Sequence, residues 1–232
     1  MKSVYHKADS RGHADHGWLD TYHTFSFAGY YDPERMRFGV LRVLNDDVIG
    51  EGRGFDTHPH DNMEIITIPL EGDLAHKDSM GNGSVIKEGD IQVMSAGTDI
   101  FHSEFNHNED KPAKILQIWV FPKQKNVQPR YDQLSIREVE QDNTLYQVLS
   151  PSPDDQGVWI HQQAWFHLGK FDQGKAGSYT LKNKDNGVYL FVISGSVTVE
   201  GQELSARDGM GLWETEKIDF TAGSDARFLV ME

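Results

Sequence analysis

The stretch that decides the fold runs from His58 to Glu104 and reads HPHDNMEIITIPLEGDLAHKDSMGNGSVIKEGDIQVMSAGTDIFHSE. It opens with His58-Pro59-His60 and closes with His102-Ser103-Glu104. In each triplet two side chains that can bind metals are separated by one residue, and residues two apart on a β-strand point to the same face. Two such strands facing each other across a barrel would bring three imidazoles and one carboxylate to one point. The stretch therefore predicts a mononuclear metal site inside a small β-barrel.

The alternative is that these histidines are purely structural. The 11 histidines of the 232-residue chain would form about 0.5 His-x-His pairs by chance, so the first triplet is not decisive alone. The second triplet is no stronger by itself. Their surroundings are more informative. Gly52 and Gly54 precede the first triplet and an apolar run at 64–70 follows it, while Gly89-Asp90 and another apolar run precede the second. This setting among predicted strands favours a metal site.

Short apolar runs with Gly, Asp and Asn between them recur along the chain and indicate an all-β protein. The strands expected in the first half are residues 38–44, 64–70, 83–87, 91–95, 101–106 and 114–121. Residues 122–143 are more polar and are expected to connect two halves, with a short helix near 135–140. Residues 188–213 repeat the strand, glycine, strand, turn and Gly/Asp order of 64–95, which indicates a degenerate duplication. We therefore predict domains at 1–135 and 136–232, the second of them metal-free because it lacks a His-x-His pair.

Two glutamates compete for the carboxylate role. Glu104 is favoured as a ligand because it shares a strand face with His102. On the run that starts at Glu64, the even positions are apolar, which would turn Glu64 toward the barrel interior. Parity leaves open whether Glu64 binds the metal, orients an imidazole or marks a strand edge. We predict that it contacts and orients a ligand and does not bind the metal itself.

The other histidines have simpler interpretations. His13, His16 and His23 lie in a polar N-terminal stretch and are expected to be solvated or to cap loops. His76 precedes a predicted turn and is expected to form a strand-end hydrogen bond. His107 leads into a charged loop and is expected to be exposed.

Composition narrows the function classes. The net charge of −14 disfavours direct contact with DNA or RNA, which needs a basic surface. The chain has no cysteine, so disulfides, thiolate ligands and a cysteine nucleophile are unavailable. Residues 1–11 lack an apolar segment and no run reaches membrane-spanning length, so a cytoplasmic protein without membrane contact is expected.

The ligand set also limits the chemistry. A divalent ion with three neutral imidazoles and one carboxylate leaves a charge of about +1, which favours a singly anionic ligand such as an enolate or phenolate. Four protein ligands leave one or two coordination positions open, as a catalytic metal requires. Glu104 or Glu64 could then accept a proton from a bound hydroxyl.

Eight collinear motifs resemble the pirin family of the cupin superfamily. They are GWLD (17–20), HTFSF (23–27), LRVLNDD (41–47), HPH (58–60), MEI (63–65), HKDS (76–79), MSAG (94–97) and HSE (102–104). The match is close over about residues 10–121 and loose in the second half. So many motifs in the same order make the resemblance specific, and it extends to bacterial pirin-like proteins assigned quercetin 2,3-dioxygenase activity.

The resemblance implies a bicupin fold, with two double-stranded β-helix (jelly-roll) barrels and a metal in the N-terminal one. It implies that His58, His60, His102 and Glu104 bind the metal and that Glu64 does not. Iron, as Fe(II), is the metal associated with the family, and nickel, cobalt, manganese, copper or zinc fit such a site as well. The implied reaction is cleavage of the central ring of a flavonol by dioxygen with release of carbon monoxide, in which Glu104 takes the proton of the 3-hydroxyl.

Other functions fit the same resemblance. Eukaryotic pirins resemble redox-sensitive regulators, so a metal-bearing protein that acts through protein partners is the alternative to a dioxygenase. A third interpretation is another cupin metalloenzyme acting on an unknown small molecule, because the fold does not dictate the chemistry. Three residues depart from the usual patterns and bear on pocket shape: Ala96 replaces a proline, Asp99 replaces a glycine, and Pro69 interrupts a predicted strand.

Overall fold

The structure is a computed structural model that describes residues 1–232. It divides into two compact units, each assembled from separate pieces of the chain. The N-terminal unit comprises Gly12–Arg137 and Pro151–Gln163, and the C-terminal unit comprises Met1–Arg11, Glu138–Ser150 and Ala164–Glu232. Apart from the short 3-10 helices η1 (Ala8–Ser10) and η2 (Ile136–Glu138), all elements are strands. No helix has the length and apolar character needed to cross a membrane.

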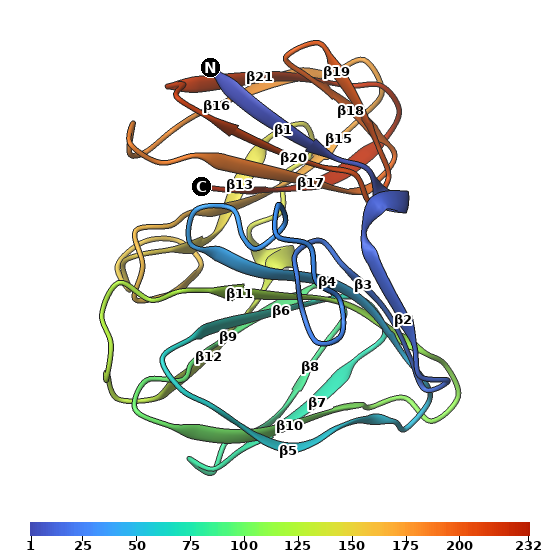
Figure 1. The fold of residues 1–232 in the computed structure, drawn as a ribbon, viewed down its shortest axis with the longest axis vertical. Coiled ribbons are helices and arrows are strands. Elements are labelled where there is room, and N and C mark those ends of the chain that lie inside the picture. Colours follow the sequence, from blue (N-terminus) through green and yellow to red (C-terminus); the bar gives the residue numbers. More distant parts are fainter. The chain divides into compact units, whose positions relative to one another are not determined.

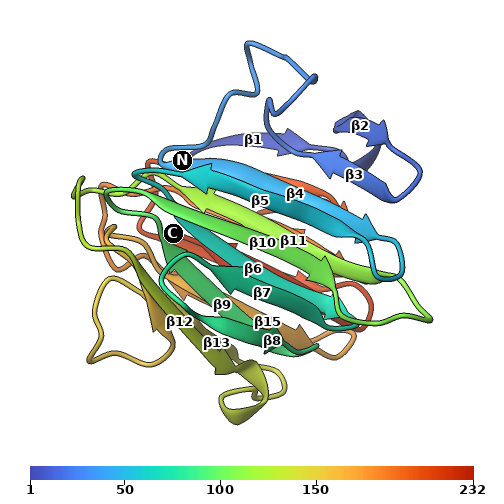
Figure 2. The same ribbon diagram turned by 90° about the horizontal axis from the view of Figure 1, so that it is seen from below.

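The N-terminal unit consists of two antiparallel sheets that face each other (Figures 1 and 2). The larger sheet has the strand order β12-β9-β6-β11-β4-β3-β2, and the smaller has the order β5-β10-β7-β8. β14 (Val158–Trp159) lies beside β9 and β12. The remaining bounds are β2 (Gly12–Asp15), β3 (Leu19–His23), β4 (Leu41–Ile49), β5 (Gly54–His60), β6 (Glu64–Glu71), β7 (Leu74–Asp78), β8 (Gly83–Ile86), β9 (Asp90–Ser95), β10 (Ile100–Asn106), β11 (Ala113–Val120) and β12 (Arg130–Ser135).

Pro69 lies in β6, a central strand, at a place that tolerates the missing N–H. β6 pairs with β9 only from Glu64 to Thr67, so that side of the strand has no partner at Pro69. On its other side Pro69 lies opposite Ile115, next to a register shift in β11. Pro69 thus interrupts the pairing of its strand as the sequence predicts, although β6 is a central strand and not an edge strand, because proline is accommodated where a ladder is interrupted.

The interior of the N-terminal unit has apolar ends and a polar middle. One apolar cluster contains Leu19, Ile49, Leu74, Ile86 and Ile115. The other contains Ile65, Met94, Ala96 and Ile100, with Trp119 packed against it. Strand parity places Gln117 of β11 between Ile115 and Trp119 on the same face, so the sheet carries polar side chains between two apolar layers.

The C-terminal unit also has two antiparallel sheets. One contains β1-β20-β17-β22-β15-β13 in that order, and the other has the order β16-β21-β18-β19. Apolar residues fill its interior, including Phe171, Phe220 and Phe228, whose ring centroids lie 5.1–5.5 Å apart. The bounds are β1 (Lys2–His6), β13 (Leu145–Ser150), β15 (Phe166–Phe171), β16 (Ala176–Thr180), β17 (Val188–Ser194), β18 (Ser196–Val199), β19 (Gln202–Ser205), β20 (Gly209–Trp213), β21 (Lys217–Ala222) and β22 (Ala226–Met231).

The all-β class predicted from the sequence is confirmed, and the predicted helix is a single 3-10 turn, η2. The compact units differ in two places from the contiguous domains expected at 1–135 and 136–232. β1 belongs to the C-terminal unit because Lys2–His6 pair with β20. Residues 151–163 belong to the N-terminal unit, where the N–H of Lys123 donates to the carbonyl oxygen of His161 (2.7 Å).

Candidate metal centre

β5 and β10 carry the two predicted triplets, and they are hydrogen-bonded neighbours in the smaller sheet. His102 lies directly opposite His58, and a β-bulge follows before Glu104. The expectation that the triplets face each other across the barrel is therefore wrong: adjacent strands of one wall bring them together. Gly54 permits this pairing, because a Cβ at that position would lie 2.1 Å from the carbonyl oxygen of Glu104.

The three predicted histidines converge. Their ring centroids lie 4.8 Å (His58–His60), 4.4 Å (His58–His102) and 4.9 Å (His60–His102) apart. One nitrogen from each lies within 4.8 Å of the others. A second group with the same spacing joins His102 to Glu104 and His76. The four predicted ligands thus fall into these two spatial groups, which share His102.

Hydrogen bonding at these rings fits a divalent cation. His102 is 1% exposed, yet neither of its ring nitrogens has a hydrogen-bond partner. A buried polar atom without a partner is costly, and a metal ion would satisfy it. Nδ1 of His58 lies 2.7 Å from the carbonyl oxygen of Asp56, which fixes the proton on Nδ1 and leaves Nε2 as a ligand atom.

Burial also sets the charge state of the site. Desolvation, followed by the neighbouring charge of His58, lowers the pKa of His60 to about 4. Desolvation, followed by the neighbouring charges of His58, His60 and His76, lowers the pKa of His102 far below its usual value. Both imidazoles are therefore neutral near pH 7, as metal ligation requires.

Glu104 is buried and held from two sides. Nε2 of Gln117 donates to its Oε2 (2.8 Å), and Oγ1 of Thr67 donates to its Oε1 (3.3 Å). Burial raises the pKa of Glu104 to about 7, while these two hydrogen bonds act in the opposite direction. Of its two oxygens, Oε1 is the more weakly engaged.

His76 was expected to be a strand-end hydrogen-bonder, and the structure gives it a more central position. Its ring lies 5.3 Å from that of His102, and its Nδ1 has no partner. Nε2 lies 3.5 Å from Oδ2 of Asp78, a carboxylate that also accepts from the main-chain N–H groups of Met80 and Asn82. The only sequence signal for this position was the motif HKDS at 76–79.

Glu64 is not among the residues that the structure brings together, and the parity argument for it is wrong. Thr67 reaches Glu104, so the odd positions of β6 face the site and Glu64 lies on the other face. Its Oε2 accepts a hydrogen bond from Ser95 (2.6 Å). Burial raises the pKa of Glu64 to about 7. Parity misled here because both faces of this central strand are buried and apolar.

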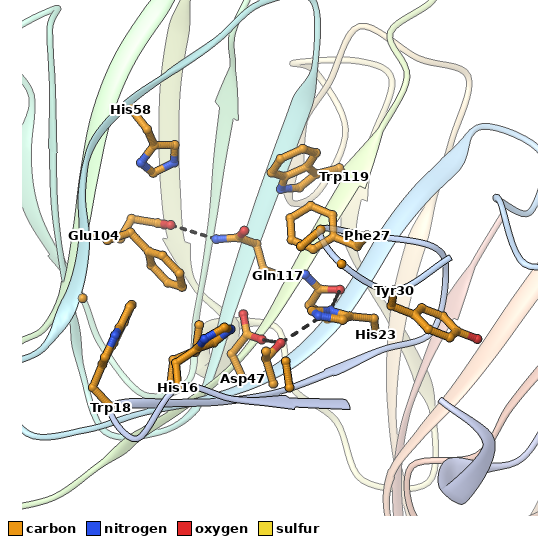
Figure 3. Close-up of a pocket in the computed structure, with 18 of the residues that line it drawn as sticks. His16, Trp18, His23, Phe27, Tyr30, Asp47, His58, Glu104, Gln117 and Trp119 are labelled. Atoms are coloured by element: carbon orange, nitrogen blue, oxygen red, sulfur yellow. Dashed lines mark hydrogen bonds between the residues drawn. The ribbon is translucent and has the colours of Figure 1, made fainter. Parts of the chain in front are cut away.

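A cavity of about 870 Å³ opens beside His58, His60 and Glu104. Figure 3 shows this cavity with His58 and Glu104 on one side of it. Its aromatic walls are Trp18, Phe27, Tyr30, Phe55 and Trp119. His13, His16 and His23 also line it, although the sequence suggested solvated or loop-capping roles. Strand pairing of β2, β3 and β4 brings this N-terminal segment to the cavity.

The comparisons with known proteins agree with this architecture. The family model described as Pirin matches residues 4–120, and the model described as Quercetinase C-terminal cupin domain matches residues 147–232. The chain belongs to the pirin family. Its fold is the predicted bicupin, with one cupin domain in each half.

Individual pirin relatives match almost end to end. A quercetin 2,3-dioxygenase of Escherichia coli K12 is 42% identical over 226 residues, covering 97% of this chain and 96% of that protein. A pirin-like protein of Caulobacter vibrioides is 39% identical over 225 residues, covering 97% and 96%. The crystal structure of a bacterial pirin from Escherichia coli in complex with nickel(II) superposes with a TM-score of 0.94 at 40% identity, covering 99% and 98%. The nickel in that structure and the His/Glu cluster here together point to a divalent metal in this pirin.

Proposed function

We propose that this protein is a metal-dependent dioxygenase of the quercetin 2,3-dioxygenase type, acting on a flavonol-like polyphenol with dioxygen. The observation that carries the proposal is His102, a buried imidazole with two unpaired nitrogens, grouped with His58 and His60 beside a large aromatic-walled cavity. The name of the Escherichia coli relative supports the same reaction. The relatives' names lend no support to a regulatory role through protein partners, and we do not propose one.

In this proposal His58, His60, His102 and Glu104 hold one divalent metal ion. Imidazole and carboxylate donors suit iron(II), which we infer to be the resident metal, and also nickel, cobalt, manganese, copper and zinc. When bound, the metal lowers the pKa of a substrate hydroxyl and supplies redox chemistry with dioxygen. With three neutral imidazoles and one carboxylate the site carries about +1, which matches a singly ionised flavonol.

Glu104 is the proposed proton acceptor. Gln117 holds Oε2 at 2.8 Å, so Oε1, bonded only at 3.3 Å, is the atom free to accept the 3-hydroxyl proton. A pKa of about 7, raised by burial, matches the operating pH of a general base. Trp119, whose ring stands edge-on to His60 at 4.9 Å, would pack beside a planar substrate and exclude water.

Aerobic incubation with quercetin tests the proposal. Protein is loaded in turn with iron, nickel, cobalt, manganese or copper. With at least one of these metals, the absorbance of quercetin should decrease and carbon monoxide should be released. Metal salts alone and metal-stripped protein are the controls, because free metals can oxidise flavonols. Absence of both signals with all five metals would reject the dioxygenase.

Metal affinity should depend on pH through Glu104. Metal binds the carboxylate form, and burial raises the pKa of Glu104 to about 7, so the carboxyl is protonated below that pH. The dissociation constant for nickel(II) should therefore rise about tenfold for each pH unit below 7 and level off above it. Titrations between pH 5.5 and 8 on the wild type and on Glu104→Gln isolate this effect. Identical pH dependence in the two proteins would contradict the assignment.

A further inference from the structure

A row of polar side chains crosses the cavity wall away from Glu104. In the larger sheet Thr67 of β6 lies opposite Gln117 of β11, which lies opposite Asn45 of β4. Asn45 in turn lies opposite His23 of β3. Thr67 and Gln117 donate to Glu104, whereas Asn45 and His23 lie one and two strands farther on. Adjacent strands are about 4.8 Å apart, so the row extends well past the proposed metal ligands.

β4 presents two polar residues to this part of the cavity. Asn45 and Asp47 are two apart and therefore share a face, and both line the cavity. Figure 3 shows Asp47 at this part of the wall. Oδ1 of Asp47 accepts a hydrogen bond from Thr21, its cross-strand neighbour. Oδ1 of Asn45 pairs with Nδ1 of His23 at 2.9 Å. Each side chain is thus oriented by one partner on β3.

Both side chains keep one hydrogen-bonding atom that no protein group engages. Thr21 is the side-chain partner of Asp47, and it leaves Oδ2 of Asp47 open. Asn45 pairs with His23 through its oxygen Oδ1, so the amide nitrogen Nδ2 of Asn45 is also open. Both residues are only 3% exposed, and neither open atom is fully enclosed, so these atoms reach the cavity. The wall offers an acceptor and a donor side by side.

We propose that Asn45 and Asp47 form a recognition subsite for hydroxyl groups on an aromatic ring that lies remote from the metal ligands. The ligand class rests on the proposed function. A phenolic hydroxyl donates and accepts at the same time, so it can donate to Oδ2 of Asp47 while it accepts from Nδ2 of Asn45. A second donor in place of Oδ2, as in Asp47→Asn, would leave the proton of this hydroxyl without an acceptor. An analogue without that hydroxyl would displace water from these buried atoms and leave them without a hydrogen-bond partner. Such a site binds the hydroxylated ligand much more tightly than the analogue.

Aromatic contacts place a ring beside this pair. Phe27 stands edge-on to Trp119 at 5.4 Å and lies 5.3 Å from the ring of His23. The aromatic surface therefore extends from the wall near His60 to the Asn45–Asp47 subsite. A planar ligand lying along it can reach both ends.

The test compares quercetin, which carries hydroxyls on both outer ring systems, with 3-hydroxyflavone, which keeps only the metal-binding one. Dissociation constants are measured on nickel-loaded protein without oxygen, by quenching of tryptophan fluorescence, since Trp18 and Trp119 line the cavity. The wild type should bind quercetin at least about tenfold more tightly than 3-hydroxyflavone. Asp47→Asn and Asn45→Leu should each reduce that ratio to about threefold or less.

Matched controls separate the outcomes. Asp110→Asn makes the same chemical change on an exposed loop and should keep the wild-type ratio. Asp47→Asn is isosteric and removes a buried carboxyl, so the fold is retained, and far-UV and near-UV circular dichroism confirm it. A wild-type ratio near one, or an unchanged ratio in both cavity variants, overturns the subsite. If selective binding persists but no metal supports turnover, the dioxygenase fails and the subsite stands; if neither flavonol binds, both proposals fail.

Discussion

Glu104→Gln is expected to lower the rate of flavonol consumption by about 10²–10⁴-fold, the range that general-base catalysis contributes. The amide has the shape of the carboxylate, and its oxygen can still accept from Nε2 of Gln117, now 2.8 Å from Oε2. Its NH₂ group can donate to Oγ1 of Thr67, so no buried polar atom loses its partner. The fold and much of the bound metal should therefore persist while the proton acceptor is lost.

Steady-state kinetics with quercetin and elemental analysis on the same preparation check this prediction. The loss should appear in kcat, with a smaller change in KM, because the proton transfer belongs to the transition state. Gln117→Leu, which removes only the donor to Oε2, should have a smaller effect on kcat than Glu104→Gln. Wild-type turnover in Glu104→Gln at full metal content would remove Glu104 from the role of base.

His102→Leu is expected to weaken metal binding by more than about 100-fold. Loss of a residue that only orients a metal ligand already lowers metal affinity about 10–100-fold. His102 is expected to bind the metal directly, and it is shared by both groups of potential ligands. The same change should leave the metal-free protein as stable as the wild type or more stable, by about 1–3 kcal/mol. The reason is that it replaces a 1% exposed ring with two unpaired nitrogens by an apolar side chain of similar size.

Two measurements on stripped and nickel-loaded protein check the opposing effects: the nickel dissociation constant and the free energy of unfolding in urea. His107→Leu is the matched control, since His107 is exposed five residues farther along the chain and its replacement should change neither quantity. Retention of wild-type nickel affinity by His102→Leu would exclude His102 as a ligand. A metal-free variant that unfolds far more easily than the wild type would show instead that the ring supports the core.

Much of the fold could be predicted because each strand carries its own pattern. The runs predicted at 64–70, 91–95 and 114–121 are β6, β9 and β11 to within one residue at each end. The spacing of His58-Pro59-His60 was also sufficient to place both rings on one face of a strand, since that depends only on the two-residue repeat. Local geometry is encoded locally, and these predictions needed nothing else.

Predictions that depended on which face of a strand meets which neighbour were less successful. Glu64 was predicted to point inward because the even positions of its run are apolar. The odd positions Ile65 and Pro69 are apolar too, so the polar residue Thr67 was the informative exception. A polar residue alone in a buried strand, such as Thr67 or Gln117, was a usable signal for the site-facing side. His76 was misinterpreted for a related reason, because nothing near it in the chain shows that β7 pairs with β10.

The sequence by itself determined the fold class and the side chains available for a metal site in this protein. It is an all-β chain with three imidazoles and a carboxylate at strand spacing, without cysteine and with the motifs of the pirin family. The tertiary structure alone decided that β5 and β10 are neighbours, that Gln117 and Thr67 hold Glu104, and that Asn45 and Asp47 face the same cavity. The physical reason is that side-chain alternation is a property of one strand. Register and pairing between distant strands arise only when the whole sheet buries its faces.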